Sequence, residues 1–188
     1  GESQRIPLKC ACQDLRAVRY RDDAAVLAVA GRCGTLHLFD SVTNKCKEYP
    51  LNAARIRDIV FLPSGNVAVC VAEDGFVYVF DTSGVQPQRR FRVTTGKLFA
   101  VTVLNSELVA VAGSDNIIRV IDWKKGQVVR RLEGHTGSVI ALDAQSGLLF
   151  SGSYDATLRR WSIADIIAGR QRIAGAGLGA TGTGQRVD

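Results

Sequence analysis

Four segments of the sequence end in a similar pattern, and their even spacing limits the fold more than any other feature. The segments are CGTLHLFD, DGFVYVFD, DNIIRVID and DATLRRWS, which end at Asp40, Asp81, Asp122 and Ser162. The intervals between these ends are 41, 41 and 40 residues, within the range of about 40 to 45 residues that is typical of one kind of four-stranded repeat. The chain is therefore expected to consist of copies of one module.

Each module has the residue pattern of β-strands joined by tight turns. Leu36 and Leu38 alternate with Phe39 on the other face, and a period of two indicates a strand. A turn pair such as Asp74-Gly75 precedes this strand, and an apolar strand such as NVAVCVA precedes the turn. Charged segments such as RRFRV and VVRRLEG suit the outer edge of a sheet. The pattern predicts an all-β fold of four-stranded antiparallel units.

These residues resemble the WD-repeat (Trp-Asp repeat) β-propeller family. The last module carries the motif most fully, with Gly134-His135 at its start and Trp161-Ser162 in place of Trp-Asp at its end. The resemblance implies about four propeller blades, as a partial ring or a segment of a larger propeller. The predicted limits are an outer strand of a preceding blade at 1–10, blades at 11–51, 52–93, 94–134 and 135–174, and a Gly-rich flexible tail at 175–188.

Four blades are expected to form an arc, because the wedge-shaped blades of WD-repeat proteins most often form rings of seven. Such an arc exposes the apolar sides of its first and last blades. Three explanations are open. The sequence is a segment of a longer protein, two copies pair into one ring, or another chain supplies the missing blades.

Composition and local motifs argue against several classes of protein. No apolar run approaches the roughly 20 residues of a membrane span. Five cysteines are an odd number, and we expect them to be reduced in an intracellular protein, cytoplasmic or nuclear. With only two histidines beside the Cys10-x-Cys12 pair, no metal site is expected. The Gly-rich tail lacks the Lys and Ser or Thr of a P-loop, so no cofactor is expected either.

A serine, a histidine and an aspartate in the last module have the side chains of a hydrolase triad. The resemblance implies instead a buried, hydrogen-bonded tetrad of His135, Ser151, Asp155 and Trp161. An imidazole can donate to a carboxylate and accept from a hydroxyl, which can accept from an indole N–H. Catalysis would need an accessible nucleophile, an oxyanion hole and a cleft, which a repeated module does not offer. We therefore expect a structural network, no catalytic residues and no enzymatic activity.

The resemblance also implies a platform that binds other proteins on the face formed by the loops before the first strands and the turns after the second strands. Aligning the modules puts twelve residues on this loop face: Asp14, Arg16, Arg32, Arg55, Arg57, Glu73, Lys97, Phe99, Ser114, Ser138, Ile140 and Tyr154. The expected partner-binding residues are Arg16, Arg32, Arg55, Arg57, Lys97, Phe99 and Tyr154.

The basic residues of this face suit an acidic or phosphorylated peptide or partner subunit, and the net charge of +6 points the same way. Two alternatives are open. The loop face is only a solvated rim in which Asp14 and Glu73 offset the arginines, or its basic residues bind a nucleic-acid backbone. The other basic clusters, Arg89, Arg90, Arg92, Arg130, Arg131, Arg159 and Arg160, are expected to protect the outer edge.

Overall fold

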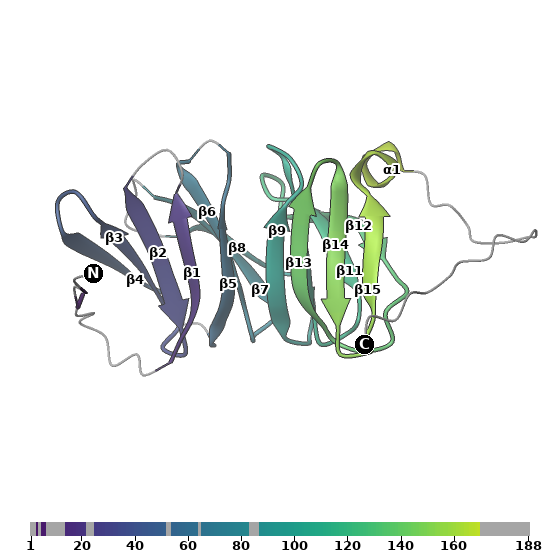
Figure 1. Cartoon of the computed structure of the whole chain (residues 1–188), viewed down its shortest axis with the longest axis horizontal. Helices are drawn as coiled ribbons and strands as arrows, with labels where there is room; N and C mark the ends of the chain where they lie inside the picture. The colour runs from purple at the N-terminus through teal and green to yellow at the C-terminus, as the bar shows by residue number, and fades with distance from the viewer. Residues whose placement is uncertain are drawn as a thin grey trace, which may run out of the picture.

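The structure is a computed structural model that describes residues 3, 5–6, 14–21, 25–51, 54–63, 65–82 and 87–169. These residues form four antiparallel sheets that follow one another along the chain (Figure 1), and within each sheet every strand pairs with its neighbour in sequence. The predicted outer strand at 1–10 is described only at positions 3, 5 and 6, and the predicted tail at 175–188 lies outside the described residues. These two assignments and the blade limits stay predictions.

The strands of the first two sheets have six or seven residues each. The first sheet consists of β1 (Leu15–Arg21), β2 (Val26–Gly31), β3 (Thr35–Asp40) and β4 (Lys45–Pro50). The second sheet consists of β5 (Ile56–Phe61), β6 (Val67–Ala72), β7 (Phe76–Asp81) and β8 (Pro87–Arg92).

The last two sheets repeat this pattern up to the third strand of the fourth sheet. The third sheet consists of β9 (Leu98–Val103), β10 (Leu108–Gly113), β11 (Ile118–Asp122) and β12 (Gln127–Leu132). The fourth sheet consists of β13 (Val139–Gln145), β14 (Leu148–Ser153) and β15 (Leu158–Ser162).

The four sheets are arranged as blades around a shared inner side. The first strands β1, β5, β9 and β13 contact one another in that order, whereas β4, β8 and β12 are the outermost strands of their sheets. Figure 1 shows the sheets side by side as an open arc. The predicted all-β propeller architecture is confirmed, and we refer to the sheets as the first to fourth blades.

The hydrophobic core lies between the blades. Tyr78 and Phe80 pack against residues of the first blade, while Val77 and Val79 pack against the third. Successive side chains of a strand point to opposite faces, so a strand that is buried on both faces is apolar throughout, and FVYVF of β7 is such a strand. The stacking of neighbouring blades therefore supplies most of the buried apolar surface.

One buried carboxylate joins the first strands of three blades. Asp58 of β5 accepts hydrogen bonds from the Arg19 guanidinium at 2.9 Å and from the Val101 backbone N–H at 3.0 Å. Burial raises the pKa of Asp58 despite these hydrogen bonds. The matching residue, at which pairing with the second strand resumes after a register shift, is Ala17 in the first blade, Ala100 in the third and Ala141 in the fourth. This carboxylate link therefore belongs to the second blade.

The last blade differs from the expected four strands, because a short helix follows β15 in the described residues. Helix α1 (Ile163–Ala168) begins after Ser162, whose hydroxyl accepts from the Asp165 backbone N–H at 3.2 Å. It ends at Gly169, whose φ of 72° is in the left-handed region that favours glycine. Ile163 and Ile166 are buried against apolar residues of the third and fourth blades. Capping at both ends and these two isoleucines explain why the segment is helical.

The cysteines depart in one respect from the expectation that all are reduced. Cys33, exposed in the turn after β2, is disulfide-bonded, so the expectation is wrong for this residue; an exposed turn thiol is accessible to a second cysteine. Cys70 is free and fully buried in β6, and burial raises the pKa of its thiol. Cys10 and Cys12 lie outside the described residues.

No helix in the described part is long and apolar enough to cross a membrane. Among the described His, Cys, Asp and Glu residues, no group of three or more lies close enough together to hold a metal ion.

Candidate functional site

Every blade carries a β-bulge at the start of its first strand. The bulge residues are Arg16, Arg57, Phe99 and Ile140, each of which is skipped in the pairing with the second strand. A bulge adds a residue that has no cross-strand partner and redirects the strand locally, and bulges are common beside functional sites. The four blades therefore each present one additional side chain at the same end of the sheet.

The same backbone hydrogen bond recurs beside each bulge. It joins the turn after the second strand to the loop before the first, with N···O distances of 2.9 to 3.0 Å in the four blades: Arg32 to Asp14, Glu73 to Arg55, Ser114 to Lys97, and Tyr154 to Ser138. The structure thus brings the twelve loop-face residues to one end of the sheets, which is the lower edge of Figure 1.

One carboxylate gathers three of the basic side chains on the loop face. Glu73, whose side chain is 18% exposed, lies 3.3 Å from Nη1 of Arg57 and 3.2 Å from Nζ of Lys97. Nη1 of Arg55 lies 3.7 Å from the same carboxylate. Because Lys97 belongs to the third blade, Glu73 holds cations from two blades together.

A second carboxylate extends this network to the first blade. Asp14 lies 2.8 Å from Nε of Arg16 and 3.5 Å from Nη2 of Arg55. The loop face has five basic residues among the twelve, against Asp14 and Glu73, so its net charge is +3. The two carboxylates offset part of the charge, as the solvated-rim alternative expected, and an excess of positive charge is left.

The apolar part of the loop face lies toward the fourth blade. The Arg57 guanidinium stacks over the ring of Phe99 at 5.1 Å from its centroid, and Phe99 is half-buried. Tyr154 is 72% exposed and Ile140 is 39% exposed. The face therefore combines a charged region on the first three blades with exposed apolar side chains on the fourth.

The predicted tetrad residues meet in one hydrogen-bonded chain within the fourth blade. His135 Nδ1 lies 2.8 Å from Oδ2 of Asp155, and its Nε2 lies 2.8 Å from Oγ of Ser151. The indole N–H of Trp161 donates to the same Ser151 oxygen at 2.9 Å. Because an ionised carboxylate only accepts, the imidazole donates from Nδ1 to Asp155. Ser151 is 1% exposed, so solvent does not reach its hydroxyl.

Two threonines, which the sequence analysis did not identify, complete this network. The Thr157 hydroxyl donates to Asp155 at 2.6 Å, and the Thr136 backbone N–H donates to it at 2.9 Å. These hydrogen bonds, that of Thr157 above all, lower the pKa of Asp155 well below its ordinary value. The sequence signal for Thr157 is its position two residues after a turn aspartate, where its own N–H also bonds the carboxylate at 2.9 Å.

The turn aspartates of the second and third blades have different partners. The Tyr78 hydroxyl donates to Asp74 at 2.6 Å. In the third blade, Arg119 donates to both oxygens of Asp115, at 2.7 and 3.0 Å, and the Thr94 hydroxyl donates to it at 2.6 Å. Tyr78 and Arg119 both follow their aspartate by four residues, which is a spacing that the sequence analysis did not use.

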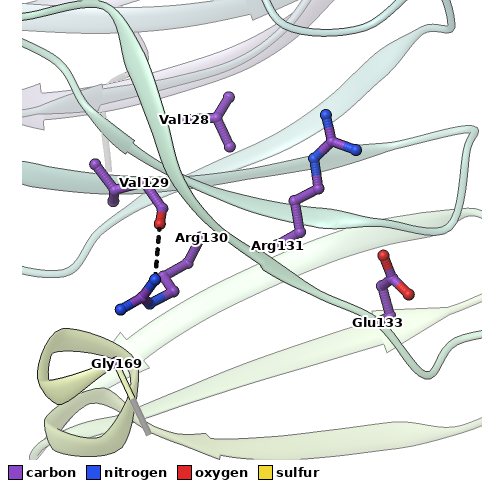
Figure 2. A pocket seen from close by; sticks show the side chains of 6 residues that line it. All are labelled: Val128, Val129, Arg130, Arg131, Glu133 and Gly169. Carbon is purple, nitrogen blue, oxygen red and sulfur yellow. Dashed lines mark hydrogen bonds between the residues drawn. The ribbon is translucent and has the colours of Figure 1, made fainter. Parts of the chain in front are cut away.

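A hollow of about 430 Å³ lies away from the loop face, between β12 and the end of α1 (Figure 2). Val128, Val129, Arg130, Arg131, Glu133 and Gly169 line it. Figure 2 shows the side chains of Arg130 and Arg131 pointing away from each other, and Arg130 Nη1 donates to the Val129 carbonyl at 3.4 Å. The two arginines therefore do not converge on one ligand in this hollow.

The family model of the WD domain, G-beta repeat, matches residues 126–162, which contain the end of the third blade and most of the fourth. The chain is 21% identical over 173 residues to the Periodic tryptophan protein 2 homolog of Caenorhabditis elegans, in a match that covers 87% of this chain and 19% of that protein. It is 30% identical over 140 residues to WD repeat-containing protein 81 of Danio rerio, covering 68% of this chain and 7% of that protein.

A third relative is the Guanine nucleotide-binding protein subunit beta-1 of Drosophila melanogaster, 26% identical over 131 residues, which are 67% of this chain and 38% of that protein. The chain thus spans well under half the length of each of these relatives. The matches agree with the repeat spacing and with the blade architecture. The chain belongs to the WD-repeat β-propeller family, whose members generally act as scaffolds for protein interactions.

Proposed function

We propose that the chain is a non-catalytic scaffold that binds an acidic or phosphorylated segment of another protein on its loop face, within a larger assembly. The observation that supports this most directly is the row of bulge residues Arg16, Arg57 and Phe99 on adjacent blades. Arg16 pairs with Asp14, and Arg57 pairs with Glu73 and stacks on Phe99. Rigid strands and a shared backbone hydrogen bond hold these side chains in place. An intracellular location, cytoplasmic or nuclear, belongs to the same proposal.

The charges on this face suit an oxyanion. The guanidinium group presents donors in a fork that matches a carboxylate or a phosphate, and Arg57 is held by stacking on Phe99. Arg16 and Lys97 are about half exposed, at 49% and 57%, so they keep donors free for a ligand. A bound carboxylate or phosphate would share the cations that Glu73 and Asp14 now contact.

The exposed apolar residues supply a second point of attachment. Binding energy at protein interfaces concentrates in a few residues, among which Tyr is enriched. Tyr154 is the most exposed aromatic residue of the loop face, and Ile140 belongs to the same blade. A ligand whose acidic group meets the first three blades would place an apolar side chain against Tyr154.

The tetrad fits this non-catalytic role. Ser151 is buried, and its hydroxyl is engaged by His135 and Trp161. We infer that the four residues stabilise the turn that carries Tyr154 and do not react with a substrate. Completion of the arc by a second copy, or by another chain that supplies the missing blades, stays an alternative mode of partnership.

The test is a peptide array that contains acidic, phosphorylated and neutral segments, followed by titration of the strongest ligand by fluorescence anisotropy. Arg57→Gln should weaken binding at least tenfold, since a charge-assisted hydrogen bond contributes about 1.5 to 3 kcal/mol. Tyr154→Ala should weaken it by a similar factor. The matched control is Arg160→Gln, which removes one exposed charge from β15 and should leave the affinity unchanged. Equal losses in Arg57→Gln and Arg160→Gln would refute the loop face as the site.

A further inference from the structure

The outermost strands carry a high density of positive charge. Strands β4, β8 and β12 contain seven Lys and Arg residues and one Glu, a net charge of +6, which equals the formal net charge of the entire sequence. All seven cations are exposed: Lys45, Lys47, Arg89, Arg90, Arg92, Arg130 and Arg131. The outer circumference of the arc is therefore more basic than the loop face, where two carboxylates offset five cations.

These cations recur at one position of the repeat. Lys47 pairs with Leu38, Arg89 with Val79, and Arg130 with Val120 in the strand ladders. Residues directly opposite each other in an antiparallel pair share a face of the sheet. Because the three apolar partners pack against the next blade, each cation points into the outer gap between its own blade and the next one.

The neighbouring residues of the outer strands face the other way, toward the preceding blade. Arg90 and Arg131 are the residues in this position on β8 and β12. The gap between the first and second blades thus receives Lys47 and Arg90, and the gap between the second and third receives Arg89 and Arg131. Each of these two gaps has a cation on both of its walls.

Both gaps open as hollows on the surface. The first has a volume of about 280 Å³ and is lined by three cations, Arg21, Lys45 and Lys47, by one carboxylate, Asp40, and by uncharged residues. The second has a volume of about 430 Å³ and is lined by Val79, Arg89, Trp123 and Lys124. The indole N–H of Trp123 donates to the Ser106 carbonyl at 3.0 Å, which fixes the ring. Lys124 Nζ lies 5.7 Å from the ring centroid and 3.9 Å from Glu107.

We propose that the outer circumference of the arc, with the cations of β4, β8 and β12 and with Trp123, binds a single-stranded nucleic acid along its phosphate backbone. A groove with positive charge that follows the backbone, together with an aromatic side chain for stacking, is the common form of such sites. A ligand that crosses three blades must bring negative charges at regular intervals, and a phosphodiester chain carries one per nucleotide. This surface is separate from the loop face and adds a second ligand to the proposed scaffold.

The experiment measures binding of a fluorescently labelled oligouridylate of about 20 nucleotides, longer than the roughly 4 to 16 nucleotides of single-stranded sites, at several salt concentrations. The test variant replaces Arg89, Arg90 and Arg131 by Gln. Its affinity at low salt should fall at least tenfold, and the slope of log K against log salt should become shallower by about 2, since each phosphate contact contributes about 0.7. The matched control replaces Arg16, Arg32 and Lys97 by Gln, which removes the same charge from the loop face and should leave both quantities unchanged.

A second readout isolates the aromatic contact. The chain has two tryptophans, so Trp123 is the sole emitter in the Trp161→Phe variant, and the oligonucleotide should quench its fluorescence. Circular dichroism checks that every variant is folded; if the triple variant is not, Lys47→Gln with Arg130→Gln replaces it. Equal losses in the outer-strand and loop-face variants would overturn the proposal, and so would absence of quenching. Equally tight, outer-strand-dependent binding of a poly-glutamate peptide would assign the surface to acidic polypeptides instead.

Discussion

The third and fourth blades hold the same turn by different chemistry. In both, the turn aspartate accepts a hydrogen bond from the backbone N–H two residues later, at 3.4 Å for Asp115 and 2.9 Å for Asp155. The other partners differ: Asp155 binds an imidazole from the loop before β13, whereas Asp115 binds a guanidinium from β11 of its own hairpin. The turn aspartate is therefore the same acceptor in both blades, whereas the side chain that donates to it differs.

The difference decides how much each donor contributes to stability. Arg119 is 5% exposed and the Asp115 side chain is 26% exposed, so removal of the guanidinium leaves a partly buried carboxylate without its compensating charge. His135 is equally buried, but Asp155 keeps its hydrogen bonds to Thr136 and Thr157 when the imidazole is lost. The third blade is thus expected to depend more on Arg119 than the fourth depends on His135, because Arg119 supplies the charge that balances Asp115 as well as two hydrogen bonds.

The largest expected effect is that of Arg119→Ala. The substitution leaves Asp115 with the Thr94 hydroxyl and one backbone N–H, and it should lower the free energy of unfolding by about 3 kcal/mol. Urea denaturation monitored by circular dichroism measures the change. The control is Arg131→Ala, the exposed residue directly opposite Arg119 on β12, which should cost less than about 0.5 kcal/mol. Equal losses in the two variants would remove the distinction between the blades.

His135→Ala should have a smaller effect, of about 2 kcal/mol, because buried groups that lose a partner cost about 1 to 3 kcal/mol. The variant should lower the melting temperature and leave peptide binding on the loop face largely intact. Thr136→Ala serves as the control, since Asp155 uses only the backbone N–H of Thr136. A loss of binding at unchanged stability would contradict the structural role of the tetrad.

The smallest expected effect is on how stability depends on pH in acid, through the turn aspartates. The Thr157 hydroxyl lowers the pKa of Asp155. Burial, the largest single influence on Asp115, raises its pKa, but the hydrogen bonds from Arg119, Thr94 and Ile117 and the Arg119 charge together lower it. A lowered folded-state pKa stabilises the protein above the ordinary value of 3.8, and this contribution is lost as the pH falls below it. The melting temperature of Asp155→Asn should therefore depend less on pH below about 4 than that of the unmodified chain. If the melting temperatures of the two proteins fall in parallel as the pH falls, that result would argue against a lowered pKa of Asp155.

Much of the fold could be predicted from the sequence because the repeat spacing and the two-residue alternation report directly on blades and strands. The tetrad residues could be named because His135 and Trp161 occur in a module whose pattern resembles the family. Helix α1 was missed although its signals were present: Ser162 and Asp165 have the spacing of a capping box, and Gly169 follows.

The loop-face network could not be predicted, because it depends on distances across blades. The partners of the turn aspartates in the second and third blades lie four residues along the same hairpin, but the residue types alone do not show that these side chains turn toward the aspartate. Arg119 has the residue type of a surface position, and only the stacking of the blades buries it. Glu73 contacts Lys97 because two loops from different blades converge. The basic residues of the outer strands were visible in the sequence, but their common direction into the gaps follows from the strand register.

The bulge residues can contact a partner without taking part in the strand pairing that holds each sheet together. Arg16, Arg57, Phe99 and Ile140 have no partner in the ladder, so a different side chain there leaves the pairing of the sheet as it is. Each blade thus has one surface position that can be substituted at little cost in stability. Because these positions follow one another around the arc, single substitutions would let the same scaffold bind a new partner.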